Sequence, residues 1–133
     1  MREIVDHKVN PANDTLLITV LDQPGAGGAN HVYGIAGMDL VRNAAAMATP
    51  DDRPDSEVSI IFQCGPINEH GVNGVTQEAL LAIVVDRLRS FQAGPFSCRE
   101  NALALTHIET GLLWLQKRTL DRMRRGVEGT NKV

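Results

Sequence analysis

The chain has 133 residues, of which 43% are hydrophobic, and a formal net charge of -3 at pH 7. This size and composition predict a single compact domain, residues 1–133, with a modest core. No stretch approaches the roughly 18–20 consecutive apolar residues of a membrane span, and the opening MREIVDHKVN lacks the apolar run of a secretory signal. We therefore expect a cytoplasmic protein with no membrane partner.

The first half of the sequence predicts a small antiparallel sheet within a β-rich region, residues 1–66. Residues 15–22, TLLITVLD, are rich in β-branched side chains, and the turn-forming QPGAGGAN separates them from a second candidate strand, HVYGIAGMD, at 31–39. The acidic, proline-interrupted stretch at 43–57 favours a mobile or short-helical connection. A third candidate strand, EVSIIFQC, covers residues 57–64.

The second half predicts a helical hairpin over residues 76–126, after a loop at 67–75 and before a tail at 127–133. Thr76 is the expected cap of the first helix, whose first turn carries Glu78 and which runs to about Gln92, before Gly94 and Pro95. Apolar residues recur along this helix at three- and four-residue spacing, which predicts a packing stripe. The stripe consists of Leu80, Val84, Leu88 and Phe91.

Ser97 and Glu100 form an S-x-x-E capping box, so we expect the second helix to begin at Cys98 and to end at Gly126. Its expected packing stripe is Leu105, Ile108, Leu112, Leu115 and Thr119. The short connection AGPF makes the two helices antiparallel. The expected fold class is therefore α+β, a small antiparallel β-sheet region followed by a long antiparallel helical hairpin.

Charge is unevenly distributed, which points to the C-terminal end as a place for an anion. Basic residues gather there: Lys117, Arg118, Arg122, Arg124, Arg125 and Lys132. Acidic residues gather in the middle: Asp51, Asp52, Asp55 and Glu57. On the second helix, His107, Trp114, Arg118 and Arg125 share one side. Guanidinium groups suit phosphates and an aromatic face suits a nucleobase, although solvated surface with one packed tryptophan explains the same pattern.

No catalytic group, metal site or cofactor motif emerges. PGAGGANH lacks the lysine and hydroxyl of a phosphate-binding loop, so it is interpreted as a turn. The four histidines, His7, His31, His70 and His107, have no metal-ligand spacing. Cys98 lies nine residues from His107 along one helix, so we expect a buried structural cysteine rather than a nucleophile. With Cys64 it fits neither a disulfide framework nor a zinc motif.

Three segments carry a family resemblance: FQCGPINEHGVNGVTQEALLAIVVDRLRSFQ, FQAGPFSCRENALALTHIETGLLWLQKRT and the closing RRGVEGT. Across about residues 58–130 the sequence resembles the phage Thoeris anti-defence sponges of the first type, whose hairpin domain is shared with an anti-CBASS sponge family. The resemblance implies a small protein in the cytoplasm of an infected bacterium, assembled as dimers that can associate further into hexamers. It implies binding without catalysis of glycocyclic ADP-ribose signals and, in some members, of cyclic trinucleotides at separate pockets.

The same resemblance assigns roles to individual residues. Phe91 matches the aromatic that stacks on the ligand base, Asn101 matches a polar residue of that pocket, and Arg118 matches a phosphate-binding arginine. Arg122 and Arg125 are not matched by the resemblance, and we add them to the site because they lie one and two turns further along the same helix. With Arg99, the expected ligand-binding set is Phe91, Arg99, Asn101, Arg118, Arg122 and Arg125. For Phe91, a place in the hairpin core is the alternative.

Three other functions stay open at this point. An enzyme that degrades the same nucleotide needs a general base or a metal-bound water, neither of which the sequence indicates. A nucleic-acid-binding module is disfavoured because the whole chain is acidic and only one helix end is basic. A virion or assembly protein that uses the hairpin only to oligomerise is compatible with the composition.

Overall fold

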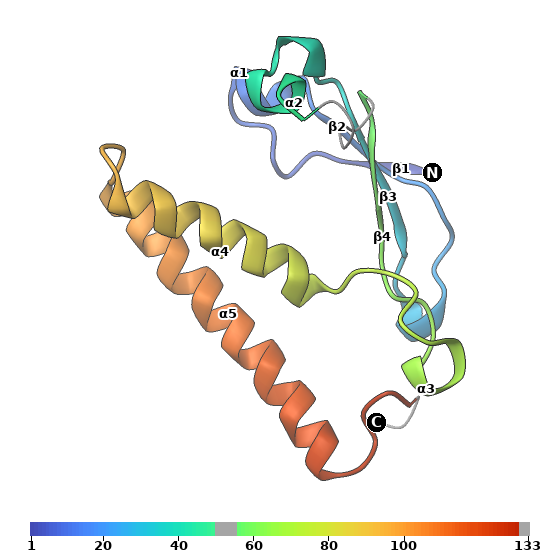
Figure 1. Cartoon of the computed structure of the whole chain (residues 1–133). Coiled ribbons are helices and arrows are strands. Elements are labelled where there is room, and N and C mark those ends of the chain that lie inside the picture. The colour runs from blue at the N-terminus through green and yellow to red at the C-terminus, as the bar shows by residue number, and fades with distance from the viewer. Residues whose placement is uncertain (50–55, 131–133) are drawn as a thin grey trace. The chain divides into compact units, whose positions relative to one another are not determined.

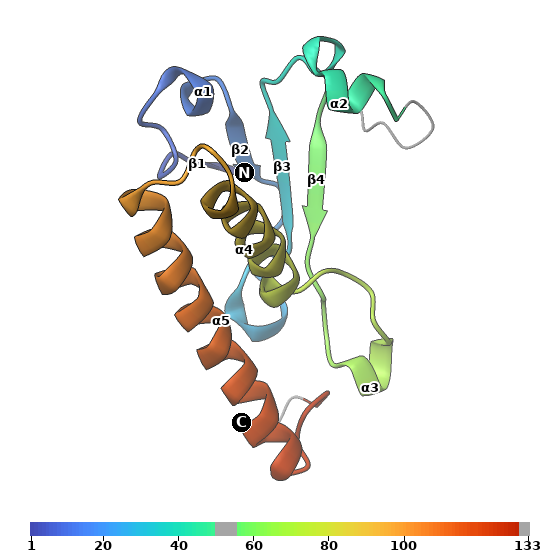
Figure 2. The ribbon, with the colours of Figure 1, turned by 60° about the vertical axis from the view of Figure 1, so that its left-hand side comes forward.

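The computed structural model describes residues 1–49 and 56–130. The chain forms two compact units, Met1–Cys64 and Gly65–Val133. The first holds a four-stranded antiparallel sheet and the second holds two long antiparallel helices (Figures 1 and 2). The α+β class is therefore confirmed, and the assignment of residues 1–133 to a single domain stays a prediction.

The sheet of the first unit is an antiparallel meander in the order β1-β2-β3-β4. Its strands are β1 (Arg2–Ile4), β2 (Leu17–Val20), β3 (Val32–Ala36) and β4 (Val58–Ile61). The three expected strands are confirmed, each shorter than predicted. β1 was not foreseen, because three residues carry no readable alternation and only pairing with β2 makes them a strand.

Short helical turns connect the strands: α1 (Pro11–Asp14), η1 (Ala26–Gly28), η2 (Leu40–Arg42) and α2 (Ala44–Met47). α2 confirms a short helix in the connection before β4. Its N-cap is Asn43, whose side chain accepts a hydrogen bond from the backbone N–H of Ala46. The acidic residues Asp51, Asp52 and Asp55, on which part of the charge argument rested, lie outside the described residues.

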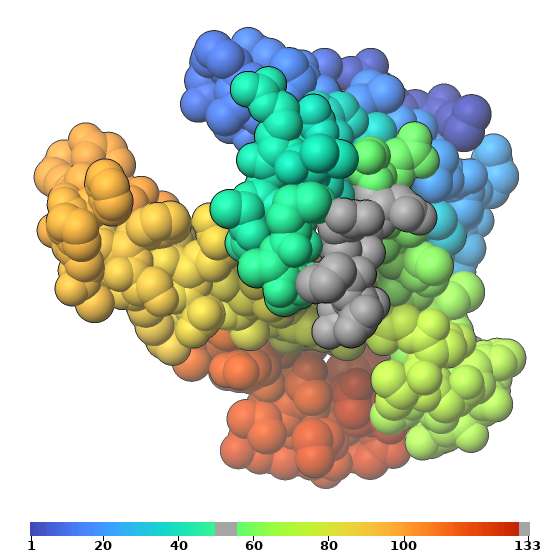
Figure 3. Space-filling view, turned by 45° about the horizontal axis from the view of Figure 1, so that its top comes forward, coloured from blue at the N-terminus to red at the C-terminus, as the bar shows by residue number. Residues whose placement is uncertain are grey.

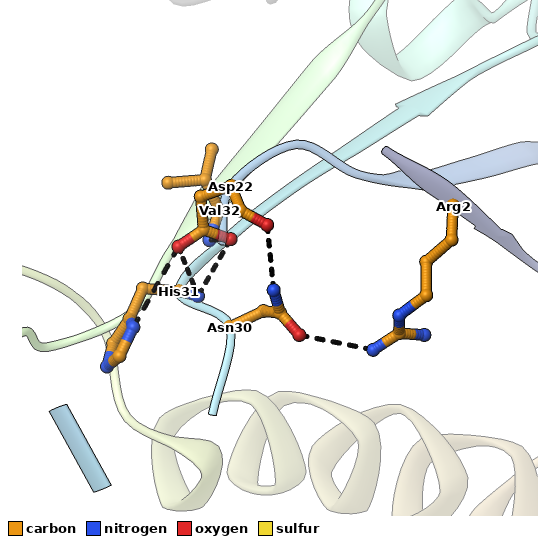
Figure 4. Close-up of polar contacts among 5 residues, drawn as sticks. All are labelled: Arg2, Asp22, Asn30, His31 and Val32. Carbon is orange, nitrogen blue, oxygen red and sulfur yellow. Dashed lines mark hydrogen bonds and ion pairs between the residues drawn. The ribbon is translucent and has the colours of Figure 1, made fainter. Parts of the chain in front are cut away.

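The turn between β2 and β3 is held by a carboxylate, as Figure 4 shows. Asp22 accepts hydrogen bonds from the backbone N–H groups of His31, at 2.9 Å, and Val32, at 3.1 Å. Asn30 donates to the Asp22 carbonyl at 2.7 Å, and its own Oδ1 accepts from Arg2 of β1. Desolvation raises the pKa of Asp22, but these N–H groups outweigh it and hold the pKa below its ordinary value of 3.8.

The second unit contains α3 (Ile67–His70), α4 (Gln77–Ala93) and α5 (Arg99–Arg124). Thr76 caps α4 as predicted, because its hydroxyl accepts a hydrogen bond from Ala79 N–H at 3.1 Å. The loop that joins α4 to α5 is the amber segment at the left end of the hairpin in Figure 3. None of the described helices has the length and apolar content needed to cross a membrane. α3 differs from expectation, since residues 67–75 were predicted as loop throughout.

The predicted packing stripe of α4 is confirmed in part, since Leu80 and Leu88 are half-buried. Val85 is 3% exposed, whereas Val84 and Phe91 are exposed at 40% and 38%. One residue along an α-helix turns the side chain by about 100°, so the buried face takes in Val85 and not its predicted neighbour Val84. The predicted packing stripe of α5 is confirmed, since all of its residues are half-buried: Leu105, Ile108, Leu112, Leu115 and Thr119.

The start of α5 corrects two expectations. Cys98, not Ser97, is the N-cap: its Sγ accepts a hydrogen bond from the backbone N–H of Asn101 at 3.4 Å. The side chain of Gln92, at the end of α4, accepts a hydrogen bond from Cys98 N–H and thereby holds this residue outside the helix. The capping box with Glu100 therefore does not form. Cys98 is also exposed, not buried.

The end of α5 is a Schellman turn that reverses the chain. Gly126, at a φ of 70°, donates its N–H to the carbonyl of Met123, and Val127 donates to the carbonyl of Arg122. The chain then turns back toward α3 (Figure 1), where the backbone N–H of Asn68 donates to Gly129 at 3.2 Å. We call residues 126–130 the C-terminal loop.

Candidate functional site

Three of the predicted site residues gather where the hairpin turns. Phe91 lies near the end of α4, and Arg99 and Asn101 lie in the first turn of α5. The Phe91 ring is partly exposed, so the hairpin core alternative is not what the structure shows. We call Phe91, Arg99 and Asn101 the tip cluster.

Arg87 belongs with the tip cluster although the sequence did not single it out. Its guanidinium carbon lies 5.4 Å from the centroid of the Phe91 ring, in a cation–π contact across one turn of α4. The four-residue spacing of an arginine and an aromatic on one helix was the available signal. The contact places a positive charge beside a ring that solvent reaches.

The other three predicted residues lie at the far end of α5, and we call Arg118, Arg122 and Arg125 the basic end. Arg118 is exposed and forms no ion pair or hydrogen bond with any residue that the structure describes. Its neighbour Lys117 is instead bound to Asp121, with 2.6 Å between Nζ and Oδ2. This hydrogen bond is the main reason why the pKa of Asp121 lies below its ordinary value.

Arg122 has an environment unlike that of Arg118. Its side chain is 12% exposed, and Nε lies 3.0 Å from a carboxylate oxygen of Glu128. One terminal nitrogen donates to the carbonyls of Val127, at 2.9 Å, and Thr130, at 3.2 Å. Arg122 therefore holds the C-terminal loop against the end of α5. Arg125, the C-cap residue, is exposed on the same end of the helix.

The remaining side of α5 carries an open groove of about 390 Å³, lined by Thr110, Leu113, Trp114 and Lys117. Trp114 is 66% exposed, and His107, Arg118 and Arg125 are exposed with it. The side of α5 that carries His107, Trp114, Arg118 and Arg125 thus faces solvent in a single chain. Within residues 1–49 and 56–130, no three His, Cys, Asp or Glu side chains gather as a metal site requires.

The tip cluster and the basic end do not meet within one chain. Asn101 and Arg118 are both in α5, separated by about 17 residues, which corresponds to about 25 Å at the usual rise of about 1.5 Å per residue. No small nucleotide reaches from one to the other. Contact with both sets at once requires residues from two copies of the chain.

A family model described as the Acb2/Tad1 hairpin domain matches residues 54–120, which is half of the chain. The chain belongs to this family. The match contains all of α4 and most of α5, so the tip cluster and Arg118 lie inside the Acb2/Tad1 hairpin domain, while Arg122 and Arg125 lie just beyond the matched range.

One curated relative, Thoeris anti-defense 1 of Bacillus phage SBSphiJ7, is 54% identical over 74 residues. This overlap is 56% of the present chain and 52% of the relative. The chain therefore spans about half the length of the curated relative that it matches. The resemblance to the Thoeris anti-defence sponges, drawn from the three sequence segments, is confirmed at the level of the Acb2/Tad1 family.

Proposed function

We propose that this protein is a phage anti-defence protein that binds and sequesters cyclic nucleotide immune messengers without cleaving them. Glycocyclic ADP-ribose is the expected first ligand, so that Thoeris signalling is blocked in the cytoplasm of the infected bacterium. Cyclic trinucleotides, and with them CBASS signalling, are the second expected class. The observation that carries the proposal is the Acb2/Tad1 hairpin domain over residues 54–120, with a 54% identical relative named Thoeris anti-defense 1.

The chemistry of the two residue sets supports a nucleotide as the ligand. The tip cluster offers an aromatic face for a base, and the basic end offers guanidinium groups for a pyrophosphate. Arg118 suits the second role because its guanidinium has no counter-ion among the described residues. A messenger held between the tip of one hairpin and the basic end of another is contacted at both of its chemical groups.

Affinity supports a pocket shared by two chains. A sponge competes with a cellular sensor, which requires binding near nanomolar, or about -12 kcal/mol. One exposed helix face leaves most of a ligand in water and does not reach this value. A pocket between chains buries the ligand and strengthens each charged contact.

The small number of apolar side chains buried within one chain supports oligomerisation. Among the described residues only two apolar side chains are buried, Val20 in the sheet and Val85 in the hairpin. Large apolar side chains on the two long helices remain exposed instead: Ile83, Val84, Phe91, Leu103, Leu113, Trp114, Leu120 and Met123. Apolar surface of this extent favours association, so we propose a dimer that can assemble further into a hexamer.

The test is calorimetric titration of the purified protein with glycocyclic ADP-ribose, and separately with a cyclic trinucleotide. We expect binding near nanomolar, one ligand per site shared by two chains, and recovery of the chemically intact messenger after heat denaturation. Absence of binding to both classes contradicts the proposal. Recovery of a linear product identifies a nucleotide-degrading enzyme instead.

The virion or assembly alternative has its own measurement. Mass spectrometry of purified virions detects a structural component, whereas a sponge is absent from the particle. No specific observation favours this alternative or a nucleic-acid partner, and the partners that we propose are the messengers and other copies of the chain.

A further inference from the structure

We infer that Glu128 is a built-in competitor for the anionic ligand at Arg122, so that the messenger has to displace this carboxylate and loosen the C-terminal loop. The inference rests on the proposed function and adds a regulatory step to the same site. It makes Arg118 and Arg122 of α5 unequal: Arg118 is ready for an anion, while Arg122 becomes available only after an exchange.

The contacts of Arg122 define the closed state. Its Nε donates to the Glu128 carboxylate at 3.0 Å, while a terminal nitrogen donates to two carbonyls of the C-terminal loop. A carboxylate and a phosphate present similar pairs of oxygen acceptors to a guanidinium, so one replaces the other without a change in the donor. Glu128 therefore occupies the position that a ligand phosphate would take.

Exposure indicates from which side the exchange occurs. The side chain of Glu128 is 34% exposed, against 12% for Arg122, so solvent reaches the carboxylate before it reaches the guanidinium. An incoming anion meets the negative charge of Glu128 first and is repelled by it. The ion pair thus weakens binding until the carboxylate moves away.

The backbone couples this exchange to α3. Gly129 is buried at a φ of 80°, and its carbonyl accepts a hydrogen bond from the backbone N–H of Asn68. Val127 and Thr130 are bound to Arg122 on either side of Gly129. When Arg122 turns to a phosphate, the carbonyls of Val127 and Thr130 lose the guanidinium as a donor, although the N–H and hydroxyl of Thr130 still donate to Val127. The part of the loop that carries Gly129 is then held less firmly against α3.

The test compares Glu128→Gln with the parent by calorimetric titration with glycocyclic ADP-ribose. Glu109→Gln is the matched control, because Glu109 makes a comparable surface ion pair, 2.8 Å from Arg89, and the substitution changes the net charge equally. We expect Glu128→Gln to bind about three- to thirtyfold more tightly and Glu109→Gln to bind as the parent does. Equal or weaker binding by Glu128→Gln, with the parent still binding, overturns the inference and leaves the proposed function intact.

A parent that binds no messenger overturns the proposed function, and the inference falls with it. A second measurement uses the unaltered protein and does not depend on how the variants fold. Amide hydrogen exchange at Asn68 should become faster when glycocyclic ADP-ribose is added, while exchange near Phe91 becomes slower. Slower or unchanged exchange at Asn68 in the loaded protein contradicts the displacement of Glu128.

Discussion

The guanidinium of Arg87 lies over the ring of Phe91, with 5.4 Å between its carbon and the ring centroid. The contact leaves Phe91 partly open to solvent, at 38% exposure, while the arginine covers part of its ring. A ring held in this way is suited to stack on a base with little loss of side-chain entropy.

Phe91→Leu is expected to weaken binding of glycocyclic ADP-ribose by about 1–3 kcal/mol, which is about five- to 150-fold, because the aromatic face is lost while apolar bulk remains. The melting temperature should change little, since Phe91 is not in the core. Phe96→Leu, in the exposed turn of the hairpin, is the control and should bind as the parent. Equal effects of the two changes would assign no special role to the tip cluster.

Arg118→Ala is expected to lower the affinity for the messenger by one to two orders of magnitude, because a charge-assisted contact to a phosphate contributes about 1.5–3 kcal/mol. The fold should be unaffected, since the guanidinium has no partner among the described residues. Arg118→Lys should recover only part of the loss, because an ammonium group lacks the bidentate fork. Calorimetry and thermal melting measure the two effects separately.

Arg89→Ala is the matched control for Arg118→Ala, because it removes an exposed arginine from the other helix of the hairpin. It should leave binding unchanged and reduce stability by no more than about 1 kcal/mol, as for other surface ion pairs. If both variants of Arg118 bind as tightly as the parent, the site lies elsewhere on the protein.

Val85→Ala is expected to destabilise the protein by about 2 kcal/mol, because Val85 of α4 is only 3% exposed and its truncation leaves a small cavity. Val84→Ala deletes the same atoms from an exposed neighbour and should have a smaller effect in a monomer. Urea denaturation at several protein concentrations measures both. A concentration-dependent loss confined to Val84→Ala would place Val84 in an interface between chains.

Gly129→Ala should disrupt the C-terminal loop at a cost of about 2–5 kcal/mol, because a positive φ disfavours alanine and its Cβ would lie 2.8 Å from Cγ1 of Ile67. Gly126→Ala shares the positive φ, but no atom lies within 4 Å of the new Cβ, so about 1–2 kcal/mol is expected. Limited proteolysis near the C-terminus compares the two variants. Equal sensitivity to protease would contradict the packing of the loop against α3.

Asp22 should make the sheet acid-sensitive. Its pKa is lowered in the folded state, so its contribution to stability is fully present above its ordinary value of 3.8 and is lost as the pH falls through the folded value. Asp22→Asn should therefore be less stable than the parent at pH 7, with a difference that shrinks as the pH falls below about 4. Thermal melting across this range tests it, with the exposed Asp86→Asn as control. A difference that is independent of pH contradicts the role of the carboxylate.

Local sequence determined the helices and their ends where the signal is confined to a few neighbouring residues. Thr76 and Gly126 were correctly placed at the ends of the hairpin, because a hydroxyl cap and a left-handed glycine act on backbone groups within one turn. The three segments that carry the family resemblance, within residues 58–130, likewise identified the Acb2/Tad1 family, which the family match confirmed.

Only the tertiary structure decided features that depend on contacts between distant segments. Cys98 replaced Ser97 as the cap of α5 because Gln92, from the preceding helix, binds its N–H. Arg118 and Arg122, four residues apart and alike in sequence, differ because the C-terminal loop folds back onto only one of them. The spacing of residues along a helix specifies which side chains lie on the same face. Which other segment packs against that face is determined by the path of the whole chain.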